Sequence, residues 1–102
     1  MMHLMRTVIE TPTFKKQADA LWNEDERLEF ITWISSNPLA GDVIPGADGA
    51  RKVRWSAKSK GKRSGVRVVY FNLSAQGVVY LVAMYEKSER ENISANEIKR
   101  VT

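Results

Sequence analysis

The apolar residues change their spacing along this 102-residue chain, and that change limits the folds it can adopt. Phe14, Ala18, Leu21 and Trp22 recur at the spacing of one helical face. After residue 50 the apolar residues alternate with polar ones or form continuous runs, which is the pattern of β-strands. Helices followed by consecutive strands are typical of an α+β fold with an antiparallel sheet. We expect residues 1–102 to form a single domain of this class.

Capping residues predict where the first two helices begin and end. Thr11, followed by a proline, is a suitable cap after a short strand at residues 6–10. Asn23, with a glutamate three residues later, has the spacing of a capping box and predicts a second helix immediately afterwards. Asn37 and the proline after it end that helix, so the two helices form a hairpin.

Three strands are expected in the second half of the chain, at residues 51–56, 65–73 and 78–85. Glycine-rich turn material at 41–49 precedes them, and residues 74–77 join the last two strands into a hairpin. Because these two strands are almost entirely apolar, we expect them at the centre of the sheet. The predicted order is an N-terminal strand, the helix hairpin, an antiparallel three-strand meander and a short C-terminal helix capped by Ser94. Helices would cover one sheet face and leave the other for function.

Acidic residues are absent between Asp48 and Glu86, and this interval contains half of the basic residues of the chain. It holds Arg51, Lys52, Arg54, Lys58, Lys60, Lys62, Arg63 and Arg67, whereas the whole chain has a net charge of +4. The remainder must therefore carry −4. Such charge separation indicates a polyanionic partner, and nucleic acid is the commonest polyanion.

The composition excludes several other classes of function. Without cysteine the chain has no disulfide, no thiolate nucleophile and no sulfur-based zinc site, so we expect no metal and no cofactor. The longest apolar run, residues 78–85, is too short to cross a bilayer, which predicts a cytoplasmic protein with no membrane partner.

Alternation within residues 51–56 places Lys52 and Arg54 on one strand face and Val53 and Trp55 on the other. Paired cations can hold phosphate, but they can also simply protect a sheet edge from further pairing. The three tryptophans also allow both a functional and a structural interpretation. They can stack on bases, yet aromatic residues at helical or strand spacing more often belong to the core, with Trp55 the nearest to the basic loop at 57–64.

Several motifs together resemble the HigB-like branch of the RelE toxins. The resemblance rests on Asn37-Pro38, Gly41-Asp42-Val43-Ile44, Gly46, Gly49, Arg51-Lys52-Val53-Arg54, Gly61-Lys62-Arg63-Ser64-Gly65-Val66-Arg67-Val68-Val69-Tyr70 and Tyr85-Glu86-Lys87. It implies a RelE-like fold, with a small antiparallel sheet flanked by helices. It also implies the toxin half of a type II toxin–antitoxin pair: an endoribonuclease that cleaves mRNA in the ribosomal A site until a cognate antitoxin binds it.

The family's working residues are matched in part. Lys52 and Arg54 match two cations on the second strand, Arg67 matches the arginine that opens the third, and Lys87 matches a basic residue after the fourth. Ser88 and Ser94 stand where RelE has a further arginine and a tyrosine. Another basic or phenolic group would have to substitute, with Lys58, Lys60, Arg63 and Tyr85 as the candidates.

Cleavage of RNA through the ribose 2′-hydroxyl requires a proton acceptor, charge stabilisation on the phosphate and a proton donor for the leaving oxygen. The single histidine, His3, is remote in sequence, and the basic interval contains no carboxylate. A lysine packed among like charges is the available alternative, because its ammonium form is destabilised. We therefore expect Lys52, with Lys87 as a second candidate, to handle protons, while Arg54 and Arg67 hold the phosphate.

The remaining cations are candidates for contact with RNA and the ribosome. They are Arg51, Lys58, Lys60, Lys62 and Arg63, with Trp55 and Tyr85 as aromatic neighbours. A loop of lysine and glycine is more often just a solvated turn. Two other functions stay open: a ParE-like toxin that targets gyrase, and an RNA-binding module without enzymatic activity.

Overall fold

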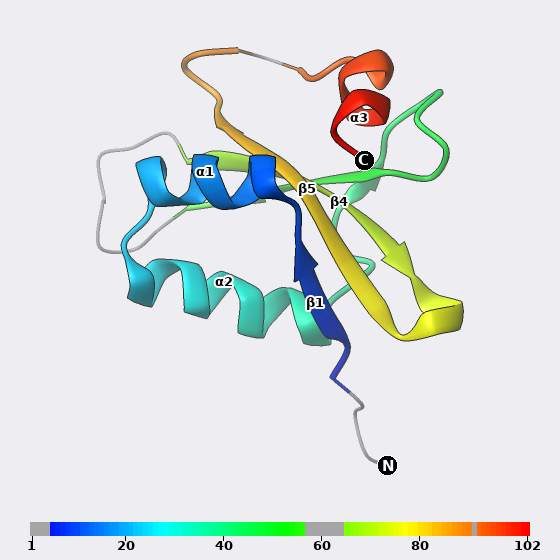
Figure 1. Cartoon of the computed structure of the whole chain (residues 1–102), viewed down its shortest axis with the longest axis horizontal. Coiled ribbons are helices and arrows are strands. Elements are labelled where there is room, and N and C mark those ends of the chain that lie inside the picture. Colours follow the sequence, from blue (N-terminus) through cyan, green and yellow to red (C-terminus); the bar gives the residue numbers. More distant parts are fainter. Residues whose placement is uncertain (1–4, 57–64, 91) are drawn as a thin grey trace.

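The computed structural model describes residues 5–56, 65–90 and 92–102. Its elements are β1 (Thr7–Glu10), α1 (Pro12–Leu21), α2 (Glu24–Ser36), β2 (Asp42–Val43), β3 (Arg51–Trp55), β4 (Val66–Leu73), the 3-10 turn η2 (Ser74–Gln76), β5 (Val78–Glu86) and α3 (Ala95–Val101). The strands form one sheet in the order β1-β5-β4-β3-β2 (Figure 1). This arrangement confirms the predicted α+β class, and the predicted helices and strands occur in the predicted order with one additional short strand, β2.

The two long apolar strands, β4 and β5, are central, as their composition predicts. Strands β3, β4 and β5 form the expected antiparallel meander, and β1 lies parallel to β5. The segment 41–49 is not turn material alone, because Asp42–Val43 pairs with β3 and forms an edge strand. Two residues give too little periodicity for a sequence pattern to reveal such a strand.

Helices α1 and α2 cover one face of the sheet (Figure 1). Phe14, Trp22, Phe30 and Ile34 from the helices pack against alternate residues of the strands, including Tyr70, and all five are buried. Both predicted helix starts are confirmed. The side chain of Thr11 accepts a hydrogen bond from the α1 backbone, and Asn23 and Glu26 form a reciprocal capping box.

The opposite face is only partly free, which corrects the expectation that the helices leave it uncovered. Helix α3 and the turn at 44–50 pack over one end of this face, where Ile98, Ile93 and Ala50 are buried against Val69 and Val82 of the sheet. An extra residue in β5 places both Val82 and Ala83 on this side. The seven-residue α3 is too short to show clear amphipathic periodicity, so its position came from tertiary packing.

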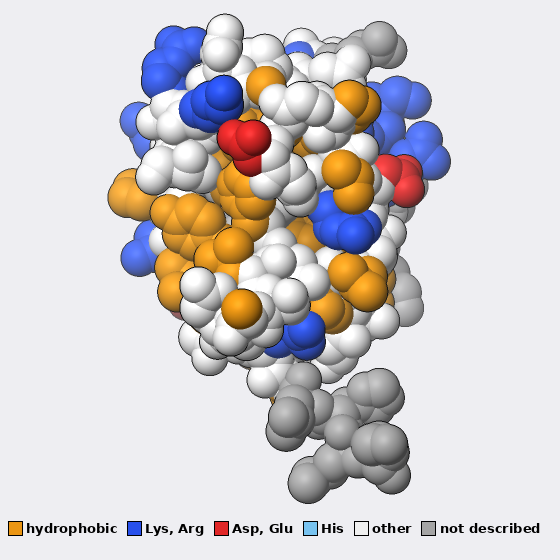
Figure 2. All heavy atoms as spheres, turned by 90° about the vertical axis from the view of Figure 1, so that its right-hand side faces the viewer, with side chains coloured by type: hydrophobic (Ala, Val, Ile, Leu, Met, Phe, Trp, Pro, Cys, Tyr) orange, Lys and Arg blue, Asp and Glu red, His pale blue; other side chains and the backbone are white. Residues whose placement is uncertain are grey.

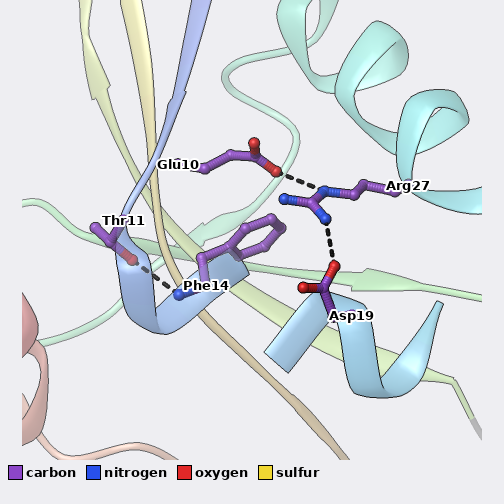
Figure 3. A network of polar contacts seen from close by, with 5 residues as sticks. All are labelled: Glu10, Thr11, Phe14, Asp19 and Arg27. Carbon is purple, nitrogen blue, oxygen red and sulfur yellow. Dashed lines mark hydrogen bonds and ion pairs between the residues drawn. The ribbon is translucent and has the colours of Figure 1, made fainter. Parts of the chain in front are cut away.

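An arginine joins the first three elements (Figure 3). The Arg27 guanidinium on α2 lies 2.8 Å from the Glu10 carboxylate at the end of β1 and 2.7 Å from that of Asp19 on α1. These ion pairs raise the pKa of Arg27, chiefly through the hydrogen bond to Glu10. Thr11, beside this network, also donates a 2.7 Å hydrogen bond to the carbonyl oxygen of Val82, which fixes the start of α1 to β5.

The side of the molecule with the β4–β5 turn presents several groups of apolar side chains, with scattered Lys and Arg and few Asp or Glu (Figure 2). Among the large apolar residues, Ile9 and Leu73 are exposed on β1 and β4. Within the described residues, no helix has both the length and the apolar character needed to cross a membrane.

Candidate active site

Strands β3 and β4 bring three cations to one hollow on the sheet face that carries α3. Lys52 and Arg54 project from β3, and Arg67 projects from the neighbouring strand β4. They line a hollow of about 410 Å³, whose other lining residues are Ala40, Asp42 and Val53. The structure therefore brings together three of the four residues predicted to be catalytic.

Strand register explains how the two arginines meet. Arg54 lies directly opposite Arg67, and Arg67 lies directly opposite Tyr85 on β5. Directly opposed residues in antiparallel strands point to the same face, with Cβ atoms about 5 Å apart. The three side chains consequently form one row across three strands.

The environments of these arginines differ. Arg54 is exposed, whereas only 8% of Arg67 is accessible to solvent. Within the described part of the chain, no carboxylate lies at ion-pairing distance from either guanidinium. Burying a charge without a counter-charge is costly, by several kcal/mol in general. A phosphate would reduce that cost, so this pair has the chemistry of an anion site.

Tyr85 ends the row and is 6% exposed. Burial raises the pKa of its phenol, and the positive charges of Arg67 and Arg90 oppose that rise. The Arg90 guanidinium lies 5.5 Å from the centre of the Tyr85 ring, in cation–π geometry. Tyr85 therefore remains a neutral hydroxyl at neutral pH and lies between two arginines.

The segment after β5 adds groups that the sequence analysis did not assign to the site. The ammonium of Lys52 donates a 2.8 Å hydrogen bond to the side-chain oxygen of Asn92. Arg90 donates to the backbone oxygen of Asn92 at 3.0 Å and pairs with Glu97 of α3 at 2.6 Å. The Arg90 hydrogen bond, with help from the Ser94 backbone, lowers the pKa of Glu97 from 4.5 to about 2. These contacts link Lys52 to the start of α3.

Asp42 also lines the hollow, opposite Lys52 in the β2–β3 register. The acid-free interval begins after Asp48, so an argument from that interval alone leaves Asp42 out. Asp42 does occur in the Gly-Asp-Val-Ile motif, and this motif was the one signal that pointed to it.

The residue before Asp42 is anchored to the sheet. The Gly41 amide donates to the Tyr70 hydroxyl at 3.0 Å, and that hydroxyl donates to the carbonyl oxygen of Pro38 at 2.8 Å. Arg51 donates a 2.6 Å hydrogen bond to the carbonyl oxygen of Gly41. A Cβ atom at Gly41 would lie 2.8 Å from the backbone oxygen of Lys52, so only glycine permits this approach. Burial raises the pKa of Tyr70, which keeps the hydroxyl protonated as a donor.

Other predicted contact residues lie elsewhere. Trp55 packs on the α2 side of the sheet, 4.9 Å from the Trp33 ring and 5.3 Å from the Phe30 ring, which favours the core alternative over stacking on a base. Arg51 points to that same side and holds Gly41. Lys87 is exposed in the turn after β5 and does not line the hollow. His3, Lys58, Lys60, Lys62 and Arg63 lie outside the described residues.

The fold is a RelE-like α+β fold. It consists of a small sheet with a helix hairpin on one face and a short C-terminal helix on the other, and the cationic hollow lies beside that short helix. In fold, the chain is similar to the Escherichia coli toxin RelE, solved in the free state as a variant with two arginines replaced by alanine. The TM-score is 0.65 and the identity 16%, over 97% of this chain and 100% of that one. No family model matches the sequence.

Proposed function

We propose that this protein is a ribosome-dependent endoribonuclease toxin that cuts mRNA in the ribosomal A site and blocks translation. A cognate antitoxin would neutralise it. One observation carries the proposal: Lys52, Arg54 and Arg67 line the same hollow, and the two arginines are directly opposed across β3 and β4. The likeness in fold to the toxin RelE also supports the proposal.

The residues divide the chemistry between them. Arg54 and Arg67 would grip the scissile phosphate and offset the charge that builds up on it during attack by the 2′-hydroxyl. Lys52 would handle a proton, with its ammonium held in position by Asn92. Lys87 stays a second candidate for proton transfer, since it is exposed beside the end of β5. No step of this scheme requires a metal ion.

The expected dependence on the ribosome follows from the small number of acid–base groups at the site. Apart from Asp42, the hollow is lined by neither a carboxylate nor an imidazole in the described residues, so general acid–base catalysis on free RNA should be slow. Orienting the substrate can supply much of the missing rate enhancement. The ribosome would hold the message with its 2′-hydroxyl aligned for attack, and the basic residues at 57–64 would contact ribosomal RNA backbone.

The test is primer extension on a message translated by purified ribosomes with the protein added. The proposal expects cuts within codons, far fewer cuts when ribosomes are omitted, and a loss of at least about 100-fold in the Arg67→Ala and Lys52→Ala variants. Lys15→Ala removes a lysine from α1, on the opposite face, and should cut like the unmodified protein.

Two results would redirect the assignment. An intact message together with inhibited supercoiling by gyrase would favour the ParE-like alternative. An intact message that the protein nevertheless binds, with a steep dependence on salt, would favour a non-enzymatic RNA-binding module. Growth arrest on expression alone, relieved by the neighbouring open reading frame, would test the antitoxin separately.

A further inference from the structure

Resting on the proposed nuclease function, we infer that Asp42 is a catalytic residue of this site, the base that accepts the proton of the attacking 2′-hydroxyl. The inference begins from position. Asp42 is the only carboxylate that lines the hollow among the described residues, and it shares that hollow with Lys52, Arg54 and Arg67.

The sheet fixes where this carboxylate points. Asp42 and Lys52 are directly opposed in the antiparallel β2–β3 pair, so their side chains lie on the same face. The neighbouring Gly41 is held by hydrogen bonds from Arg51 and to Tyr70, and it abuts the backbone of Lys52 too closely for any other residue. The contacts of Gly41 therefore help to keep the two-residue strand β2 in register with β3, in addition to the hydrogen bonds between the two strands. The result is a carboxylate at a defined edge of the phosphate-binding hollow.

The charges around Asp42 suit a base. Lys52, Arg54 and Arg67 line the same hollow, so a phosphate bound by these cations would lie next to the Asp42 carboxylate. It is also exposed and can reach a substrate. No ion pair within 4.0 Å joins it to another described residue, so its oxygens are not already committed to a cation of this part of the chain.

The reaction then balances with groups at the site. The 2′-hydroxyl gives its proton to the Asp42 carboxylate as the 2′-oxygen forms a bond to phosphorus. The bond from phosphorus to the 5′-oxygen breaks, and the leaving oxygen takes a proton from the Lys52 ammonium. The products are a 2′,3′-cyclic phosphate and a 5′-hydroxyl, with Asp42 protonated and Lys52 neutral until solvent exchanges the proton back.

Electrostatics gives this role a discriminating test. An acid without a chemical role, placed among phosphate-binding cations, only repels RNA, so removing its charge should tighten binding and leave cleavage equal or faster. A catalytic base behaves differently: Asp42→Asn should bind RNA more tightly and yet cleave more slowly. We expect the cleavage rate of ribosome-bound message to fall by roughly 10²-fold or more. The dissociation constant for an RNA with a 2′-deoxy scissile nucleotide should fall.

The matched control is Asp48→Asn, which makes the same charge change in the adjacent turn. Asp48 has a φ of 56°, where asparagine is readily accommodated. Its binding should tighten slightly, and its cleavage rate should be unchanged. Thermal unfolding of both variants verifies that each is folded.

Chemical rescue completes the design. Formate added to Asp42→Ala should restore part of the cleavage rate, because a small carboxylate can occupy the place of the missing side chain. Formate should do nothing for Arg67→Ala. Cleavage by Asp42→Asn at the unmodified rate, or a lost rate that formate cannot raise at all, would overturn the role of Asp42. Absence of cleavage by the unmodified protein would instead overturn the proposed function.

Discussion

The Lys52 ammonium and the Asn92 side-chain oxygen, 40 positions apart in the chain, are joined by a 2.8 Å hydrogen bond. The bond crosses from β3 to the segment before α3, so the position of Lys52 depends on the docking of the C-terminal helix. Asn92 is neutral and therefore leaves the charge of the ammonium available to RNA. A lysine side chain held in this way loses less rotamer entropy when substrate binds.

Asn92→Ala should lower the cleavage rate of ribosome-bound message by roughly 5- to 10-fold, in line with the loss of one hydrogen bond of about 1 kcal/mol. The bond from Arg90 reaches the backbone oxygen of Asn92 and survives the substitution. Asn96→Ala, at an exposed position on α3, is the control and should keep the full rate. Equal rates in both variants would show that the Lys52–Asn92 bond has no part in cleavage.

Arg67→Met should stabilise the protein while abolishing cleavage. Among the described residues Arg67 has no carboxylate at ion-pairing distance, and replacing such a buried charge by an apolar side chain of similar length should stabilise the fold by about 1 kcal/mol or more. For a domain of this size, each kcal/mol raises the Tm by roughly 4 to 8 °C. Arg54→Met, at the exposed partner position, should change the Tm little and still impair cleavage. A lower Tm for Arg67→Met than for the unmodified protein would contradict this reading of Arg67.

Gly41→Ala should both destabilise the fold and impair the site. The added Cβ would meet the backbone oxygen of Lys52 at 2.8 Å, and relieving that contact costs about 1 to 3 kcal/mol. Strands β2 and β3 would separate locally, moving Asp42 away from Lys52. Gly46→Asn serves as the control, because its φ of 73° suits asparagine and nothing lies within 4 Å of its Cβ position. Gly41→Ala should have a lower free energy of unfolding in chemical denaturation and a lower cleavage rate than Gly46→Asn.

Low pH should weaken the packing of α3, because protonation of Glu97 removes its ion pair with Arg90. The pKa of this carboxyl is about 2 in the folded protein against an ordinary 4.5, chiefly because it accepts a hydrogen bond from Arg90. A lowered pKa means that the stabilisation is fully present above pH 4.5 and is lost as pH falls toward 2. The free energy of unfolding of the unmodified protein should therefore exceed that of Glu97→Gln at pH 7, and the difference should disappear across that window. A difference that persists at pH 2 would assign the stabilisation to something other than ionisation of Glu97.

The sequence by itself determined the helices, the central strands and the cationic face. Caps at Thr11, Asn23 and Ser94 are local signals, since each side chain bonds to a backbone group three residues away. Alternation along β3 was sufficient to separate Lys52 and Arg54 from the core side of the sheet. These features depend on spacing within a few residues, which a sequence displays directly.

Tertiary structure decided which groups share the hollow. Strand register set Arg54 against Arg67, and pairing of β2 with β3 brought Asp42 opposite Lys52. Packing of α3 on the second sheet face carried Asn92 to Lys52. Contact with the Trp33 ring of α2 decided that Trp55 belongs to the core and does not stack on a base. Contacts between distant segments depend on register, crossover direction and the filling of two separate cores, and no local pattern in the sequence encodes those quantities.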